Sequence, residues 1–148
     1  MGELTLPASG NVYLDTSAVI YAVEKIEPYA SMLTPLWLKA RAGEIGFVAS
    51  NLLLLECLVQ PVRDKDAKLQ KTYRELLTST NEFRLMSITM DVIESALQLR
   101  ATHGLRTPDA LHAATALQMG CAQFITNDVV FRRVPNLNAI VLLEHADE

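Results

Sequence analysis

A chain of 148 residues, half of them hydrophobic and a fifth of them charged, is long enough to bury a core and too apolar to be disordered as a whole. Its formal net charge of −4 argues against a protein that holds nucleic acid on a wide basic surface. No apolar run approaches the length of a bilayer-spanning helix, so we expect no membrane segment and a single domain over residues 1–148.

The two cysteines and the start of the chain indicate a reducing compartment. Cys57 falls in a leucine-rich helix and Cys121 just before a strand, so both are expected to be small buried hydrophobic residues. The opening MGELTLPASG lacks the basic and apolar regions of a secretory signal, and we expect a cytoplasmic protein. The slightly positive mean hydropathy leaves apolar surface for a protein partner or a second copy of the chain.

The first elements in the chain are a strand and two helices. A short apolar strand over residues 12–14 is followed by a helix that Thr16 or Ser17 is placed to cap. Apolar residues recurring every three and four positions predict a second helix over residues 28–42. Pro35 is expected to kink or split that helix, because proline lacks the backbone donor that an interior position needs.

A second strand over residues 45–49 leads into a leucine-rich helix, NLLLLECLVQ, that Pro61 is expected to end. A helix that is apolar on every side is expected to be buried, which makes Glu56 its exceptional residue. A buried carboxylate has to be paired, protonated or bound to a metal ion. Two alternatives stay open: Glu56 reaches solvent at one edge of the helix, or it pairs with an arginine.

The second half of the chain continues the alternation of helices and strands. Amphipathic spacing predicts a helix over residues 64–80, whose lysines and Arg74 form a solvated face or, less favoured, a stripe that contacts phosphates. The remaining elements are a strand over 83–88, a helix over 90–102 capped by Thr89, a helix from Pro108 to Met119 capped by Thr107, a strand over 122–125, and a last strand over 139–143.

Short apolar strands separated by helices predict an α/β fold, a three-layer α/β/α sandwich around a central, mainly parallel sheet. In such folds ligands bind outside the carboxyl ends of the strands. Asp15 and Asp128 each follow a predicted strand and therefore belong to that edge, and Asp109 opens the helix that leads into the strand before Asp128. Each acid alone is also ordinary helix-end or turn chemistry, so the prediction depends on their number.

Several carboxylates brought together repel one another unless a cation neutralises them or some are protonated. Oxygen ligands without a supporting histidine or cysteine favour Mg²⁺ or Mn²⁺ over Zn²⁺. His112 lies three residues after Asp109 and on a nearby face of the same helix. We interpret it as a buried histidine hydrogen-bonded to backbone rather than as a metal ligand.

Four segments carry a family resemblance: VYLDTS around Asp15, the leucine-rich helix in which Glu56 is followed by QP, LRTPDALHAATA around Asp109, and FITNDVVF around Asp128. In this order they resemble the PIN-domain nucleases, and especially the toxin of VapBC-type toxin-antitoxin pairs. The similarity covers nearly the whole chain. Every acid of the family's pattern is present.

The resemblance implies an Mg²⁺- or Mn²⁺-dependent endoribonuclease that hydrolyses RNA through a metal-activated water, with a protein antitoxin as partner and a homodimer as assembly. The implied catalytic and metal-binding residues are Asp15, Glu56, Asp109 and Asp128. Their carboxylates would be oriented by the neighbouring polar residues Thr16, Ser17, Thr126 and Asn127. The basic residues nearest to the acids in sequence, and so the candidates for RNA phosphate contacts, are Arg100, Arg106, Arg132 and Arg133, although Arg106 has the alternative of pairing with a neighbouring acid.

Other functions are weighed against this one. A PIN nuclease of RNA maturation or decay, acting without an antitoxin, and a non-enzymatic binding module on the same fold both remain open. A phosphatase of the haloacid-dehalogenase type would need a second aspartate where the chain has Ser17, and a response-regulator receiver would need a lysine where it has Asn127 and Asp128. Both phosphoryl-transfer classes are therefore disfavoured.

Overall fold

The computed structural model describes residues 3–146 and contains a five-stranded sheet in the order β3-β2-β1-β4-β5. All four neighbouring pairs run parallel. The strands are short and their central members are buried on both faces, as expected for a parallel sheet that is covered by helices. Their bounds are β1 Asn11–Leu14, β2 Gly46–Ser50, β3 Phe83–Met86, β4 Gln123–Thr126 and β5 Ala139–Val141.

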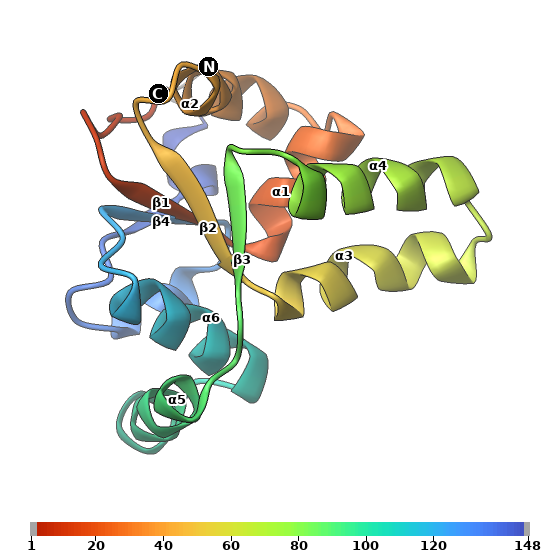
Figure 1. Cartoon of the computed structure of the whole chain (residues 1–148). Helices are drawn as coiled ribbons and strands as arrows, with labels where there is room; N and C mark the ends of the chain where they lie inside the picture. The colour runs from red at the N-terminus through yellow and green to blue at the C-terminus, as the bar shows by residue number, and fades with distance from the viewer. Residues whose placement is uncertain (1–2, 147–148) are drawn as a thin grey trace.

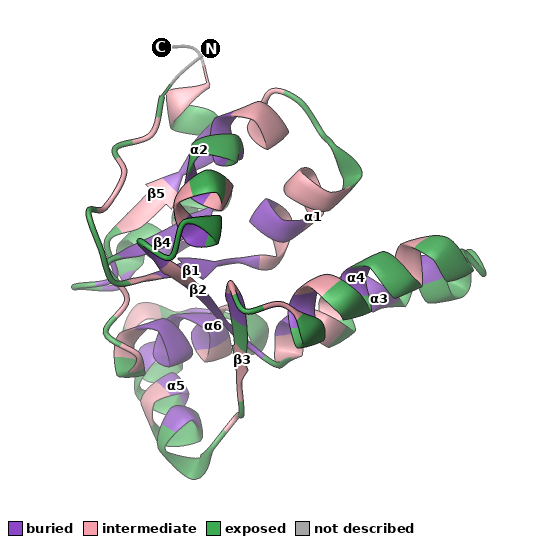
Figure 2. Ribbon diagram, turned by 45° about the horizontal axis from the view of Figure 1, so that its top comes forward, coloured by how far each residue is buried: buried purple, intermediate pink, exposed green. Residues whose placement is uncertain are grey.

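Helices cover both faces of this sheet. In Figures 1 and 2, α1 and α2 lie on one face and α5 and α6 on the other, while α3 and α4 form a pair that projects from the body beside β3. The expected three-layer α/β/α sandwich is therefore confirmed. The helices are α1 Thr16–Glu24, α2 Tyr29–Arg41, α3 Leu52–Arg63, α4 Ala67–Ser79, α5 Met90–His103 and α6 Thr107–Gln118, with 3-10 turns η1 Val129–Arg133 and η2 Leu142–His145.

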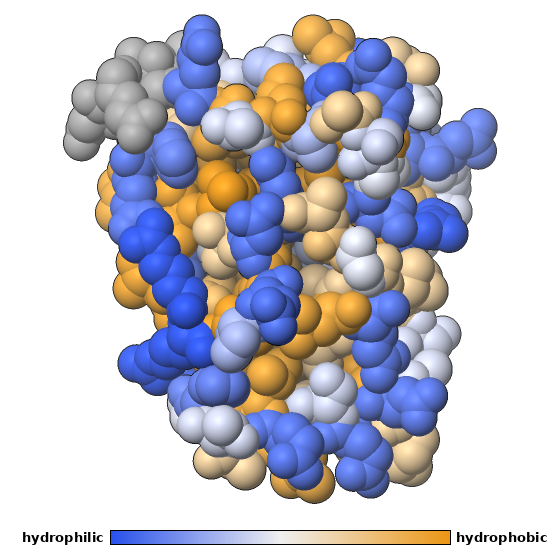
Figure 3. Space-filling model, turned by 90° about the vertical axis from the view of Figure 1, so that its left-hand side faces the viewer, coloured by the Kyte–Doolittle hydropathy of each residue, from blue (hydrophilic) through white to orange (hydrophobic). Residues whose placement is uncertain are grey.

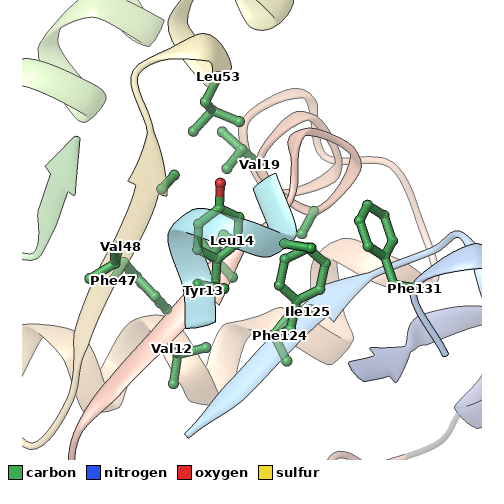
Figure 4. Close-up of a cluster of buried hydrophobic side chains, with 14 of the residues drawn as sticks. Val12, Tyr13, Leu14, Val19, Phe47, Val48, Leu53, Phe124, Ile125 and Phe131 are labelled. Atoms are coloured by element: carbon green, nitrogen blue, oxygen red, sulfur yellow. The ribbon is translucent and has the colours of Figure 1, made fainter. Parts of the chain in front are cut away.

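Aromatic side chains form the centre of the core. Tyr13 on β1 is fully buried and stacks on Phe124 of β4, with ring centroids 4.8 Å apart. Phe124 in turn contacts Phe131 of η1, and Phe47 fills the neighbouring position on β2. Figure 4 shows these rings packed together, with the Tyr13 hydroxyl at the end of its ring. The core thus holds one polar group that needs a hydrogen-bond partner.

The order of the strands reverses at β1. The chain passes from β1 to β2 and β3 on one side, then returns to place β4 and β5 on the other side of β1. At such a reversal the connections leave the carboxyl ends of adjacent strands in opposite directions, and ligands of open α/β sheets bind in the space between them. The pairing of Leu14 with Ile125 puts Asp15 and Thr126 side by side at this point.

The predicted end of α3 at Pro61 is wrong, and Pro35 does not split α2. Helix α2 runs unbroken through Pro35, because the buried side chains on both sides of the proline, Met32, Leu33 and Leu36, hold it on the core. Helix α3 continues past Pro61 to Arg63. Pro61 is buried, and its carbonyl accepts hydrogen bonds from the Asp66 amide and the Gln70 side chain, so contacts with α4 stabilise the extra turn.

The expected burial of α3 on every side is also wrong. One face packs on the body and on α4, but Leu55, Val59 and Val62 are 67%, 44% and 51% exposed. These positions lie on one side of the helix, four and three residues apart. Apolar residues on every side of a helix fit two situations: a helix buried within its own chain, and a helix with one apolar face that a partner protein covers. The sequence pattern is the same in both cases.

Some element ends differ from the predictions by one to three residues, because capping groups lie elsewhere. Asp15, not Thr16 or Ser17, caps α1, and its carboxylate accepts from the Thr16 amide. Thr107 is the first residue of α6 rather than its cap. The predicted helix over 64–80 starts at Ala67, capped by Asp66, and the last strand ends at Val141 and is followed by a 3-10 turn.

The surface mixes polar and apolar side chains. Figure 3 shows one face on which hydrophobic residues gather in several places between polar ones. Further exposed hydrophobic residues lie along α5, where Met90, Ile93 and Leu97 follow one another at helical spacing. Among residues 3–146, no helix combines the length and the apolar character needed to cross a membrane.

Candidate active site

Asp15 directly follows β1, at the point where the strand order reverses. Its amide donates to the Ile125 carbonyl at 3.0 Å, which continues the β1–β4 ladder by one residue. One carboxylate oxygen accepts from the Thr16 amide and the other from the Thr126 hydroxyl, both at 2.8 Å. Burial nevertheless raises the pKa of Asp15, against the lowering effects of His112 and these hydrogen bonds. The buried carboxylate is therefore held in one orientation but lacks a full counter-charge.

Glu56 reaches the same place from the second turn of α3. Its Oε1 accepts from the Thr16 hydroxyl at 2.8 Å and lies 2.6 Å from His112 Nε2. Burial alone would raise the pKa of Glu56, but the hydrogen bonds and charge supplied by His112 and Thr16 lower it below its usual value. Of the alternatives left open by the sequence, Glu56 is paired, and its partner is a histidine rather than an arginine.

His112 is buried on α6, one turn beyond Asp109. Its Nδ1 lies 2.6 Å from the Tyr13 hydroxyl, and its Nε2 lies 4.0 Å from Asp15 Oδ1 as well as close to Glu56. Burial alone would lower the pKa of His112, but the two carboxylates raise it above its usual value. The expected hydrogen bond to backbone is wrong, because both ring nitrogens contact side chains.

Asp109 and Asp128 are supplied by the start of α6 and by the residue that follows β4. Asp109, in the first turn of α6, pairs with Arg106 at 3.6 Å, and burial together with the charge of Asp128 raises its pKa while Arg106 lowers it. Asp128 is exposed and follows β4; its amide donates to the Thr126 hydroxyl at 3.1 Å, and its Oδ1 caps η1 by accepting from the Val130 amide at 2.9 Å. Thr126 therefore connects Asp128 directly to Asp15.

The four predicted acids thus form one linked set, which we call the acidic cluster. The negative charge of Glu56 raises the pKa of Asp15, the charges of Asp15, Glu56 and Asp109 raise the pKa of His112, and the charge of Asp128 raises the pKa of Asp109. Four segments of the chain supply these groups: the end of β1, helix α3, helix α6 and the end of β4. The structure brings Asp15 and Glu56 together through Thr16 and His112, and it joins Asp128 to Asp15 through Thr126. That all four acids hold one cation stays a prediction.

The chemistry of the donor set fits a hard divalent cation. The side chains are carboxylates, the pKa values of two of them are raised by burial, and no hydrogen bond from the described residues reaches Glu56 Oε2. Within residues 3–146 no three histidine, cysteine, aspartate or glutamate side chains already form a metal-binding group. A cation held by all four acids would therefore require their side chains to draw closer together.

The four polar neighbours of the acids have different roles. Thr16 and Thr126 donate to the carboxylates of the cluster, as predicted. The Ser17 hydroxyl is buried and makes no hydrogen bond to any part of the chain that the structure describes. Asn127 instead joins elements: it donates to the Tyr21 hydroxyl at 3.0 Å and accepts from the Leu143 amide at 2.7 Å, which ties the end of β4 to α1 and to η2.

The four predicted arginines also differ. Arg100 donates to the Leu105 carbonyl and the Thr107 hydroxyl and so stabilises the turn between α5 and α6. Arg106 pairs with Asp109, as the alternative interpretation had it, although its side chain is 81% exposed. Arg132 pairs with Glu144. Arg133 is exposed and makes no hydrogen bond or ion pair within residues 3–146, so it is the arginine most available to a phosphate.

Sequence reasoning missed Tyr13 and misjudged His112. Tyr13 reads as an ordinary core residue of a strand, and nothing in its neighbourhood along the chain indicates that its hydroxyl meets a histidine 99 positions away. The usable signal was the spacing of Asp109 and His112, which puts both on neighbouring faces at the start of one helix.

Comparison with known structures extends these observations. VapBC2 from Rickettsia felis, solved bound to a DNA fragment from its promoter, matches with a TM-score of 0.69 at 19% identity, over 88% of this chain and 97% of that one. A toxin-antitoxin complex from Klebsiella pneumoniae matches with a TM-score of 0.64 at 20% identity, over 87% and 95% of the two chains. VapC20 from Mycobacterium tuberculosis, described as a sarcin-ricin loop cleaving toxin, matches with a TM-score of 0.62 at 18% identity, over 76% and 86%. At these identities the similarity establishes a shared fold.

Sequence comparison gives the family. No curated protein matches the chain. The family model of the PIN domain matches residues 12–137, a range that includes all the acids of the cluster and every strand from β1 to β4 save the first residue of β1. The resemblance drawn from the four sequence segments is thereby confirmed, and the chain belongs to the PIN domain family.

Proposed function

We propose that this PIN domain is a metal-dependent endoribonuclease that hydrolyses RNA phosphodiester bonds. The proposal is supported by the contacts of Asp15, Glu56 and His112 at the end of β1, by Asp109 one turn before His112 on α6, and by Thr126, which joins Asp128 to Asp15. No cysteine or serine beside a general base offers a covalent route within the described part of the site. Hydrolysis by water is therefore the reaction that suits these side chains.

A bound Mg²⁺ or Mn²⁺ would supply an activated water and would neutralise charge on the phosphodiester. The chain's own residues would hold that ion through the four carboxylates and keep them oriented. Thr126 and the Thr16 amide fix Asp15, while the Thr16 hydroxyl and His112 fix Glu56. Arg133, free of internal partners among residues 3–146, is placed by sequence next to Asp128 and would contact a phosphate of the RNA.

We further propose that the protein is the toxin of a type II toxin-antitoxin pair. The structural similarity to two toxin-antitoxin complexes supports this assignment. An open groove of about 500 Å³ between α1, α2 and α4, lined in part by Val23, Trp37, Leu38 and Leu76, offers apolar surface for an antitoxin segment. The exposed stripes on α3 and α5 support a homodimer.

The nuclease proposal is tested by cleavage of a labelled single-stranded RNA. We expect cleavage with Mg²⁺ or Mn²⁺, none after chelation, and none in Glu56→Gln. Glu94→Gln, which makes the same change at an exposed position on α5, should cleave as the wild type does. Undiminished cleavage in chelator would overturn the proposal. Growth arrest on expression, relieved by the product of a neighbouring gene, would separate a toxin from a nuclease that acts without an antitoxin.

A further inference from the structure

A chain of hydrogen bonds leads from the core of the protein into the acidic cluster. The Ser50 amide at the end of β2 donates to the Tyr13 hydroxyl oxygen at 2.9 Å. That hydroxyl lies 2.6 Å from His112 Nδ1, and His112 Nε2 lies 2.6 Å from Glu56 Oε1. Tyr13 and His112 are 0% and 1% exposed. These contacts therefore form away from water, where each donor needs a specific acceptor.

The direction of every hydrogen bond follows from the first one. A backbone amide only donates, so the Tyr13 oxygen accepts from Ser50. The Tyr13 hydroxyl also has a proton to donate, and His112 Nδ1, 2.6 Å away, is the acceptor in reach. A ring nitrogen that accepts carries no proton, so the proton of the neutral ring sits on Nε2 and is donated to Glu56.

The charged form of the ring suits the carboxylates of Glu56 and Asp15, but it fits the contact with Tyr13 less well. A protonated imidazole donates from both nitrogens, and the Tyr13 oxygen would then face two donors, Ser50 and His112, with no acceptor left for its own proton. The neutral ring with its proton on Nε2 satisfies all the groups at once. It also leaves neither nitrogen with a free lone pair directed at a cation.

We propose that Tyr13 and His112 are positioning residues that fix one oxygen of Glu56 and present the other to the cation. The inference depends on the metal-dependent nuclease proposed above. Oε1 is held by His112 and by the Thr16 hydroxyl at 2.8 Å, whereas no hydrogen bond from residues 3–146 reaches Oε2. The Tyr13 ring is itself held by stacking on Phe124, with the planes 5° apart. A rigid core thereby determines where a carboxylate on the projecting helix α3 points.

The proton position is tested directly by nitrogen NMR of the imidazole rings in the metal-free wild-type protein at alkaline pH. We expect His112 to show an unprotonated Nδ1 and a protonated Nε2, and His103, which lies outside the site, serves as the reference ring. A ring protonated on Nδ1 would overturn the proposal. The NMR measurement needs no enzymatic activity and no variant. It therefore tests the proposed hydrogen-bond directions even if Tyr13→Phe fails to fold.

The positioning role is tested by Mn²⁺ affinity, measured by calorimetry. Tyr13→Phe keeps the stacked ring and removes only the hydroxyl, and we expect the affinity to fall about tenfold, a loss typical when a group that orients a metal ligand is removed. Tyr73→Phe is the matched control, because Tyr73 is equally buried and its hydroxyl also donates within the protein, to Glu24 outside the cluster. Its Mn²⁺ affinity should equal that of the wild type.

The outcomes separate the two proposals. A folded Tyr13→Phe protein with wild-type Mn²⁺ affinity would refute the positioning role while leaving the nuclease proposal intact. A wild-type protein that binds no Mn²⁺ would refute the metal-dependent function and with it the role of the network toward a cation. A shared loss of affinity in Tyr13→Phe and Tyr73→Phe would show a general effect of removing buried hydroxyls and would also count against the proposal.

Discussion

The two halves of the acidic cluster are held very differently. The inner pair, Asp15 and Glu56, is fixed by hydrogen bonds from Thr16, Thr126 and His112. The outer pair, Asp109 and Asp128, is held by fewer contacts, namely one exposed arginine at Asp109 and the Val130 amide of the η1 turn at Asp128. The inner pair is therefore organised before any cation binds. The outer pair is the half that can adjust, which explains how a cluster without a ready-made metal group could still close on an ion.

The difference between the inner and the outer pair is tested most strongly by neutralising one acid of each pair. Asp15→Asn should lower RNA cleavage by more than about 100-fold, beyond the loss typical of residues that only orient a ligand. Asp128→Asn should lower it by about tenfold, and a higher Mn²⁺ concentration should restore part of that loss, because an adjustable ligand is the easier one to replace. Rates measured over a Mn²⁺ titration give both numbers. Equal, unrescued losses in the two variants would mean that the pairs do not differ.

Thr126 joins the two halves, since its hydroxyl donates to Asp15 and accepts from the Asp128 amide. Thr126→Val keeps the shape and removes both contacts, and we expect about a tenfold loss of cleavage and a loss of roughly 1–3 kcal/mol in the free energy of unfolding. Thr115→Val is the matched control, because Thr115 is also buried but its hydroxyl donates to the Leu111 carbonyl of its own helix. Urea unfolding and cleavage rates test both variants.

The sequence predicted the frame of the site better than its internal contacts. The strand ends before Asp15 and Asp128 could be read from local apolar runs and turn residues, and their meeting followed from the geometry of parallel sheets. Local patterns hold no information on register, so the contact of Thr126 with Asp15 and that of Tyr13 with His112 had to come from the structure.

The helices show the same limit. Helices α2 and α3 continue through Pro35 and Pro61 despite the helix-breaking tendency of proline. Tertiary packing outweighs that tendency, because it supplies most of the stability of a helix in a folded protein. The leucines of α3 were read as core, yet Leu55 is largely exposed. Apolar periodicity reveals which face avoids water, but it does not say whether this chain or another one covers that face.

The pH dependence of stability tests the contacts that His112 makes with the inner pair, Asp15 and Glu56. The pKa of His112 is higher in the folded protein than in the unfolded chain, so protonated His112 contributes to the free energy of unfolding. This contribution is present in full below the unfolded pKa of about 6.5 and is lost as the pH rises through the higher folded pKa. The urea midpoint of the metal-free protein should therefore fall with rising pH in this range. In His112→Gln the fall should be smaller, whereas His103→Gln should behave as the wild type does. The same slope in all three proteins would contradict the assignment to His112.

The smallest expected effect concerns the outer rim. Arg133 has no partner within residues 3–146, whereas Arg132 is paired with Glu144. An exposed guanidinium five residues after Asp128 in the sequence would add one phosphate contact. Arg133→Gln should therefore raise the KM for RNA by only a few-fold, leave kcat unchanged and reduce the dependence of binding on salt concentration by about one released counterion. Arg74→Gln, exposed on α4, is the control and should change neither quantity. If Arg133→Gln instead lowered kcat with an unchanged salt dependence, Arg133 would act on the acidic cluster itself, and the outer pair would be more tightly organised than its hydrogen bonds indicate.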